Sequence, residues 1–331
     1  ALSERVQAAF KATAGLLEAR LPREKDPRVR QDLEILRQDA LLQVAVAEAD
    51  QRYLLPDFDV AEQVYGGVRA LLTDQVAKER YPAAVVRLGR YAGLEAGYTP
   101  LATLAEAQVR EQLGTLGLLF PYKGQLEQQL ANSNQYLDGV QELLDQYQVR
   151  GGEKALKELR VQVAAWNDFL RREVLPKARE DFRLPADLYA VRLREVGMDI
   201  PPAELAARAR TAFIEIRNQM VALAPLVARQ LEMERTDYPA VIRVLRSRQM
   251  ERDATLPLYR ERLAAIEAII RREKIVTLPE REAIIRLATA AESASTPSPS
   301  MHPPPFVNNQ GERGEFVLPL IMPSVDGVAP A

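Results

Sequence analysis

The sequence contains no cysteine and a single histidine, and both shortages limit its chemistry. Without cysteine the chain has no disulfide, no thiolate zinc site, no iron–sulfur cluster and no cysteine nucleophile. One imidazole excludes metal sites built on two histidines, such as His-Glu-x-x-His, and proton relays that need two imidazoles. Long apolar runs are also missing, so the sequence predicts no transmembrane segment.

A strong charge of one sign is lacking as well. The chain carries 44 basic and 46 acidic side chains, a formal net charge of −2. This balance argues against a nucleic-acid-binding surface. The most basic stretch, residues 243–252, has acidic neighbours in Glu251 and Asp253 and no interleaved aromatic residue. We therefore expect no nucleic-acid partner.

Apolar residues recur every three to four positions along most of the first 290 residues. This spacing is typical of amphipathic helices whose apolar faces pack together in a core. The longest such stripe runs from Leu205 through Phe213 and Ile216 to Val227, although Pro225 should kink or end that helix. The sequence predicts a mainly α fold, with a multi-helix, bundle-like body and a short β segment near the C-terminus.

The composition changes near residue 291. Residues 293–300 are rich in serine and proline, and three prolines at 303–305 cannot continue a helix. Two alternatives remain open: a linker or disordered tail, or an extended segment that packs back onto the helices. A strand-like stretch lies at about 314–320. We therefore predict a helical domain over 1–290 and a Pro/Ser-rich extended segment over 291–331, with any sheet after residue 300.

No residue can be assigned a catalytic, cofactor-binding or metal-binding role from motifs. His302 lies beside prolines, as solvated loop residues often do, and Ser300 is too near it in sequence for the usual triad geometry. Paired carboxylates such as Glu153 and Glu158 lie next to lysines and arginines, which is typical of solvated helix faces. The sequence has no nucleophile elbow and no phosphate-binding glycine loop. Trp166 and Phe169 are predicted core anchors.

Proline and aromatic residues recur as spaced landmarks along nearly all of the chain. In chain order they lie in Arg80-Tyr81-Pro82, Tyr98-Thr99-Pro100-Leu101, Pro121-Tyr122, Asn132-Ser133, Phe169-Leu170, Val174-Leu175-Pro176-Lys177-Ala178, Asp181-Phe182-Arg183-Leu184, Leu188-Tyr189, Val276-Thr277-Leu278-Pro279-Glu280 and Gly314-Glu315-Phe316-Val317-Leu318-Pro319. Together these landmarks resemble bacterial domain-of-unknown-function family 885. The resemblance implies a mostly helical protein, similar to gluzincin-type zinc metallopeptidases, with a peptide-like substrate.

The sequence departs from that family at its signature helix, His-Glu-x-x-Pro-Gly-His. No His-Glu pair is present, so no position inherits the zinc ligands or the general base. The resemblance then implies an N-terminal portion, arising by natural truncation, by processing or as half of a two-chain assembly. Zinc is expected only with the C-terminal half. Partners would be that catalytic half or a second copy, and whether the chain is an enzyme stays open.

Peptidases of this kind offer a sheet edge to the substrate backbone. By that analogy Glu315, Phe316, Val317 and Leu318 form the candidate substrate-edge strand, the alternative being a strand that only packs on helices. Two functions follow: a helical wall of a metallopeptidase cleft, inactive alone, or a stand-alone helical scaffold for protein interactions. A third possible function is that of an enzyme whose metal ion is held by carboxylates alone. The compartment is open between the cytoplasm, which we favour, and the periplasm or an exported location after removal of a leader.

Overall fold

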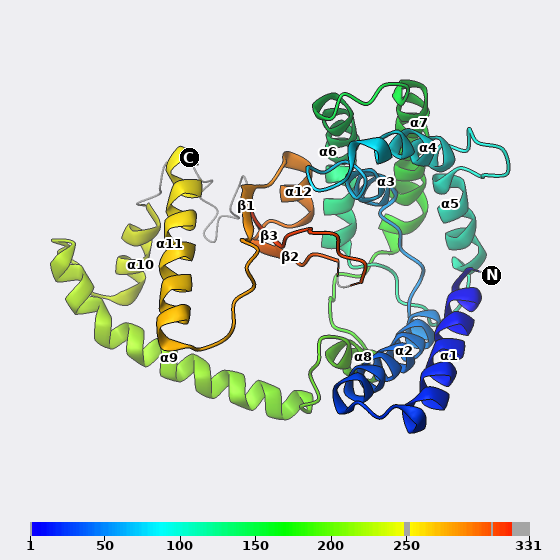
Figure 1. Ribbon diagram of the computed structural model, residues 1–331. Helices are drawn as coiled ribbons and strands as arrows, with labels where there is room; N and C mark the ends of the chain where they lie inside the picture. The colour runs from blue at the N-terminus through cyan, green and yellow to red at the C-terminus, as the bar shows by residue number, and fades with distance from the viewer. Residues whose placement is uncertain (1, 248–251, 306, 320–331) are drawn as a thin grey trace. The chain divides into compact units, whose positions relative to one another are not determined.

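The computed structural model describes residues 2–247, 252–305 and 307–319 (Figure 1). Helices make up most of this chain, which confirms the predicted mainly α class. The helices are α1 (Leu2–Arg20), α2 (Pro27–Tyr53), α3 (Val60–Arg69), α4 (Pro82–Tyr91), α5 (Leu101–Gln112), α6 (Lys123–Gln146), α7 (Glu153–Phe169), α8 (Ala186–Glu195), α9 (Pro202–Gln230), α10 (Tyr238–Ser247), α11 (Arg252–Glu273) and α12 (Ala290–Ser295). No described helix is long and apolar enough to cross a membrane, in agreement with the sequence.

The chain forms two compact units, and each unit is assembled from separate stretches of sequence. Unit 1 comprises residues 1–58, 104–128 and 167–216. Unit 2 comprises residues 59–103, 129–166 and 217–331. Unit 2 therefore continues through residue 290, where the sequence analysis placed a domain boundary.

Unit 1 is built around the long helix α2, which packs against α1 and α8. Asp26 begins α2 because its carboxylate accepts the backbone N–H of Arg28, and Pro27 lacks the N–H that a first turn leaves unbonded. An ion pair of 2.6 Å between Asp50 and Arg192 joins α2 to α8. These contacts make unit 1 a helical body.

Unit 2 has its core between α3, α4 and the parts of α6 and α7 that belong to it. Val64, Leu88, Val140 and Trp166 are buried there. α12 approaches α6 at Gly139, where an added Cβ would lie 2.7 Å from the Cβ of Ala291. Only glycine permits this approach, so the α6 sequence itself allows α12 to pack there.

A three-stranded sheet completes unit 2. β1 (Ile284–Leu287) pairs in parallel with β3 (Glu315–Leu318), and β2 (Ser300–His302) pairs antiparallel with β3. The strand order is β1-β3-β2. The short β segment near the C-terminus is confirmed, but β3 is shorter than the predicted 314–320, of which residue 320 lies outside the described chain. The expectation of no sheet before residue 300 is wrong, because a parallel partner strand need not be close in sequence.

Helix α9 differs from its prediction in two ways. It continues through Pro225 to Gln230, so that of the predicted kink or end at the proline the end does not occur. The predicted core stripe is also largely uncovered, since Ile216 and Leu223 are each 56% exposed. The buried side of α9 carries Ala224 and Ala228, whose small side chains let α9 pack closely against Val241 of α10.

Candidate functional site

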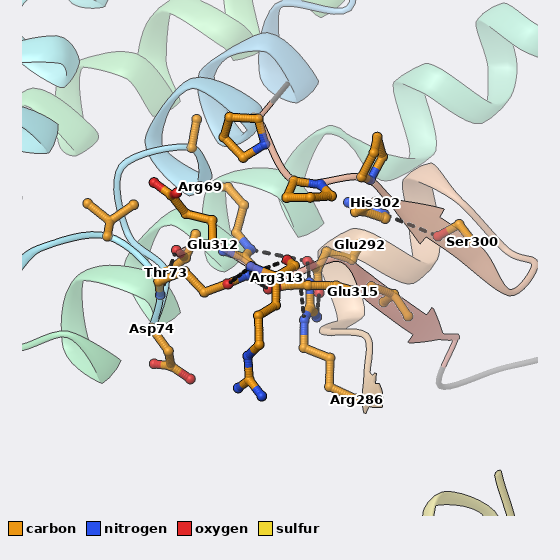
Figure 2. Close-up of a pocket in the computed structure, with 18 of the residues that line it drawn as sticks. Arg69, Thr73, Asp74, Arg286, Glu292, Ser300, His302, Glu312, Arg313 and Glu315 are labelled. Carbon is orange, nitrogen blue, oxygen red and sulfur yellow. Dashed lines mark hydrogen bonds and ion pairs between the residues drawn. The ribbon is translucent and has the colours of Figure 1, made fainter. Parts of the chain in front are cut away.

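A pocket of about 1140 Å³ opens within unit 2 (Figure 2). Its walls come from α3 and the loop that follows it, from β1 and α12, and from residues 296–319 around β2 and β3. Pro303, Pro304 and Pro305 form part of the lining, and their fixed φ angles stiffen that wall. The pocket thus brings residues 62–80 together with the C-terminal part of the described chain.

Two arginines and two glutamates form an ion-pair network at the pocket. We call Arg69, Arg286, Glu292 and Glu315 the arginine–glutamate network. Arg286 donates to both oxygens of Glu292 at 2.8 Å and, through Nε, to Glu315 at 2.8 Å. The Nε of Arg69 donates to Glu292 at 3.1 Å. The bidentate geometry suits the planar guanidinium, so this network holds α3, β1, β3 and α12 together (Figure 2).

The electrostatics of the network favour its charged state. Burial by itself would raise the pKa of Glu292, but hydrogen bonds from Arg286 and the Thr289 backbone, with the charges of Arg69 and Arg286, lower that pKa to about 2. Burial opposes the charged form of Glu315 too, and its hydrogen bond from Arg286 lowers the pKa of that carboxyl. The same partners outweigh burial and raise the pKa of Arg286. All three groups are therefore ionised at neutral pH.

Glu292 is placed by the start of α12. The Thr289 hydroxyl accepts the Glu292 backbone N–H at 3.1 Å, and the Glu292 carboxylate accepts the Thr289 N–H at 2.8 Å. This reciprocal capping box needs threonine and glutamate three positions apart, as the sequence has them. The hydroxyls of Tyr65 and Thr289 lie 3.0 Å apart and share a hydrogen bond. The cap therefore positions one carboxylate for both the helix end and the network.

The loop after α3 is bound to the segment that leads into β3. Gln75 donates to the carbonyl of Arg313 at 3.1 Å and accepts the Arg313 backbone N–H at 2.6 Å. The same amide donates to Glu315 at 3.0 Å. The Tyr81 hydroxyl donates to the carbonyl of Thr73 at 3.1 Å and closes the loop. Gln75 thus keeps Arg313 next to the loop that ends in Arg80.

Two arginines of the pocket lining form no side-chain hydrogen bond with the described residues. Within the described parts of the chain, the side chains of Arg80 and Arg313 donate to no other residue, and both are exposed. The carboxylates outside the network each accept a neutral donor: Asp74 accepts the Tyr147 hydroxyl, Glu62 the Ser295 hydroxyl, and Glu312 the Gln310 backbone N–H. Arginine side chains offer five donors each. The pocket therefore holds two guanidinium groups whose donors are open to a ligand.

β2 forms one edge of the sheet and borders the pocket. Ser300 and His302, two residues apart on one face of the strand, both line it, and Ser300 Oγ lies 3.2 Å from His302 Nε2. Met301 is 61% exposed. No other described strand pairs with the outer side of β2. His302, predicted in a solvated loop, is indeed exposed but lies in a strand.

The predicted substrate-edge strand occupies a different place in the sheet. Glu315, Phe316, Val317 and Leu318 form β3, which is the central strand, so the edge assignment is wrong. Glu315 belongs to the network, and the Phe316 ring lies 5.9 Å from that of Tyr259 on α11. Val317 and Leu318 are buried. Sequence alone indicated a strand here but not its neighbours, because strand order depends on distant segments.

The described residues do not fit a zinc centre. No group of three or more histidine, cysteine, aspartate or glutamate side chains lies close enough to hold a metal ion among them. Zinc sites in proteins use about three or four such ligands. Trp166 and Phe169 are each 1% exposed, which confirms them as core anchors.

Sequence reasoning missed the residues at the centre of the site. Arg69, Arg286 and Glu292 carry no motif for binding or catalysis. The one readable signal is Thr289-x-x-Glu292, a capping-box spacing that marks a helix start after residue 288. The ion pair between Glu292 and Arg69 could not be predicted from the sequence, because the two residues lie in distant segments that only tertiary packing brings together.

The family described as bacterial protein of unknown function (DUF885) matches residues 1–326 of the chain. No curated protein and no solved structure matches it.

Proposed function

We propose, from the premise that the chain belongs to the DUF885 family of bacterial proteins, that it forms the substrate-binding wall of a metallopeptidase. In this proposal the chain binds an extended peptide. The zinc ligands come from a C-terminal catalytic half carrying His-Glu-x-x-Pro-Gly-His, and the chain is inactive alone. The proposal rests on the resemblance of the sequence landmarks to a family similar to gluzincin-type zinc metallopeptidases.

One observation carries the proposal: β2 is an edge strand that borders the pocket. An extended peptide can add to such an edge through main-chain hydrogen bonds, while its side chains fill neighbouring space. A pocket of about 1140 Å³ is larger than many small-molecule sites and accommodates several residues. In this proposal β2, and not β3, is the strand whose edge binds the substrate backbone.

A scaffold function is the second candidate, and α9 is the observation that favours it. Ile216 and Leu223 expose an apolar stripe that would suit a partner helix. In that case β2 would bind no peptide. The two candidates differ in which surface carries the ligand.

The test uses acetyl-trialanine amide and the same peptide with its backbone nitrogens methylated. Strand addition needs peptide N–H groups, so methylation should weaken binding by about tenfold or more, since each lost hydrogen bond costs about 1 kcal/mol. Calorimetry gives the affinities, and amide NMR shifts at Ser300 to His302 locate the site. Equal binding of both peptides, or shifts confined to α9, would contradict the proposal.

The catalytic part is tested separately. The reading frame downstream of codon 331 is sequenced, and a segment encoding His-Glu-x-x-Pro-Gly-His is expected. Joined to that segment, the chain should retain zinc after dialysis against a weak chelator, whereas the chain by itself should not. Stoichiometric zinc on the chain alone would mean that its own carboxylates bind the metal.

A further inference from the structure

We infer that the pocket of unit 2 takes the free C-terminal carboxylate of its ligand, with Arg80 and Arg313 as the donors. This inference rests on the proposed function and adds the chemical class of the substrate. The peptide bound along β2 would end inside the pocket. The chain would thus be selective for peptides with a free C-terminus over internal stretches of longer chains.

The charge inventory of the pocket supports this choice. Four arginines and five carboxylates line it. Arg69 and Arg286 already form ion pairs with Glu292 and Glu315, with N···O distances of at most 3.1 Å. Arg80 and Arg313 alone among these arginines have no side-chain partner in the described residues. Their guanidinium donors are exposed in the pocket, where a ligand acceptor can replace water.

The position of the two arginines is set by the fold. Arg80 ends the short 3-10 helix Lys78–Arg80, and Arg313 precedes β3. Gln75 holds the backbone of Arg313 at both its N–H and its carbonyl, at 2.6 and 3.1 Å. Both side chains extend from backbone that is held by hydrogen bonds. Binding a ligand therefore costs less conformational entropy than it would for arginines on a long free loop.

A carboxylate suits this pocket better than a phosphate. The guanidinium fork matches the two oxygens of a carboxylate. The five carboxylates of the lining exceed its arginines in number, so a dianion meets more repulsion than a monoanion. This balance also means that long-range attraction is weak and that affinity comes from direct contact.

The experiment compares acetyl-trialanine acid with acetyl-trialanine amide on the 331-residue chain. The two peptides differ only at the C-terminus. The acid should bind about tenfold more tightly, as two charge-assisted hydrogen bonds in a solvated pocket allow. Arg80→Gln and Arg313→Gln should each reduce that preference, and the double variant should abolish it. Inorganic phosphate is titrated as a competitor and should displace the acid only weakly.

Arg229→Gln is the matched control, because Arg229 is an exposed arginine of unit 2 outside the pocket lining. It should keep the full preference for the acid. Circular dichroism checks that each variant is folded, and the comparison of the two peptides on the unaltered chain needs no variant.

The outcomes separate the two proposals. Equal binding of acid and amide would overturn the carboxylate inference and leave strand addition at β2 standing. Binding of neither peptide would overturn both. A preference for the acid that survives the double variant would also overturn the assignment of Arg80 and Arg313. Tighter binding of phosphate than of the acid would replace the peptide carboxylate with a phosphate ligand.

Discussion

At the scale of single residues, Arg286 connects three other residues at the pocket. Its guanidinium bonds Glu292, Glu315 and the carbonyl of Leu287, and its side chain is 23% exposed. Breaking a partly buried ion pair by removing one partner costs more than breaking a surface ion pair. Removing Arg286 leaves carboxylates without their counter-charge, which is the costly half of such a change.

Arg286→Met should therefore lower the free energy of unfolding by about 2–4 kcal/mol, because Glu315 loses the one ion-pair partner that the described residues give it and Glu292 keeps Arg69. Urea unfolding followed by circular dichroism measures this change. The matched control is Arg271→Met, whose partner Glu267 lies 2.9 Å away with Arg271 61% exposed. The control should cost less than about 1 kcal/mol. Equal losses in the two variants would contradict a special role for the network.

The pKa of Glu292 makes stability depend on pH. That pKa is about 2 in the folded chain against an ordinary 4.5, so unfolding takes up protons in acid. The stabilisation is complete above pH 4.5 and is lost as the pH falls toward 2. It amounts to about 3 kcal/mol, from 1.36 kcal/mol for each pKa unit.

Glu292→Gln should thus be less stable than the unaltered chain at pH 7 and nearly as stable at pH 2.5. Melting temperatures across that interval measure the difference between the two proteins. If the difference stays constant from pH 7 to pH 2.5, the low pKa of Glu292 is wrong.

At the scale of elements, the capping box at the start of α12 connects local sequence to the pocket. Thr289 accepts the Glu292 backbone N–H and shares a hydrogen bond with Tyr65 of α3. α12 has only six residues, too few for a stable helix without outside contacts. The cap and the packing of Ala291 together hold the element.

Thr289→Ala should cost about 1–2 kcal/mol, since it removes the cap and leaves the Tyr65 hydroxyl without its partner. Chemical denaturation gives the free energy. Thr211→Ala is the control, because Thr211 only back-bonds the carbonyl of Ala207 on an exposed helix face. That change should be neutral or slightly stabilising. A larger loss at Thr211 than at Thr289 would refute the role of the cap.

At the scale of the whole molecule, β3 is the part of the C-terminal segment on which the sheet depends. It pairs with β1 on one side and β2 on the other, and it carries the buried Val317 and Leu318. The alternative of a linker or disordered tail therefore does not apply to residues 315–318. Phe306, Leu320 and Ile321, further apolar residues of this segment, lie outside the described residues.

Deleting residues 301–331 should lower the free energy of unfolding by about 3 kcal/mol or more, since each buried apolar side chain is worth about 1.5–3 kcal/mol. Thermal and urea unfolding measure the change, with light scattering to detect aggregation of the uncovered surface. Val317→Asp should reproduce much of the loss, and Met301→Asp, at a 61% exposed position, should not. An unchanged melting temperature after the deletion would make the segment a dispensable tail.

Periodicity and capping residues in the sequence determined the helical class, because they act over a few neighbouring positions. Apolar spacing predicted the helices, and the Gly314–Leu320 pattern predicted a strand. The absence of cysteine and of a second histidine excluded whole classes of metal site before any fold was known.

Tertiary structure decided how those elements combine. It placed β3 between β1 and β2, left the α9 stripe exposed, and brought Arg69 to Glu292 and Arg313 to Gln75. The ion pair of Arg69 with Glu292 and the hydrogen bond of Arg313 with Gln75 join segments far apart in the chain, and their free energies depend on burial and on the partner present. A local sequence pattern does not specify which distant residue will be the partner, so the pocket could be found only in the folded chain.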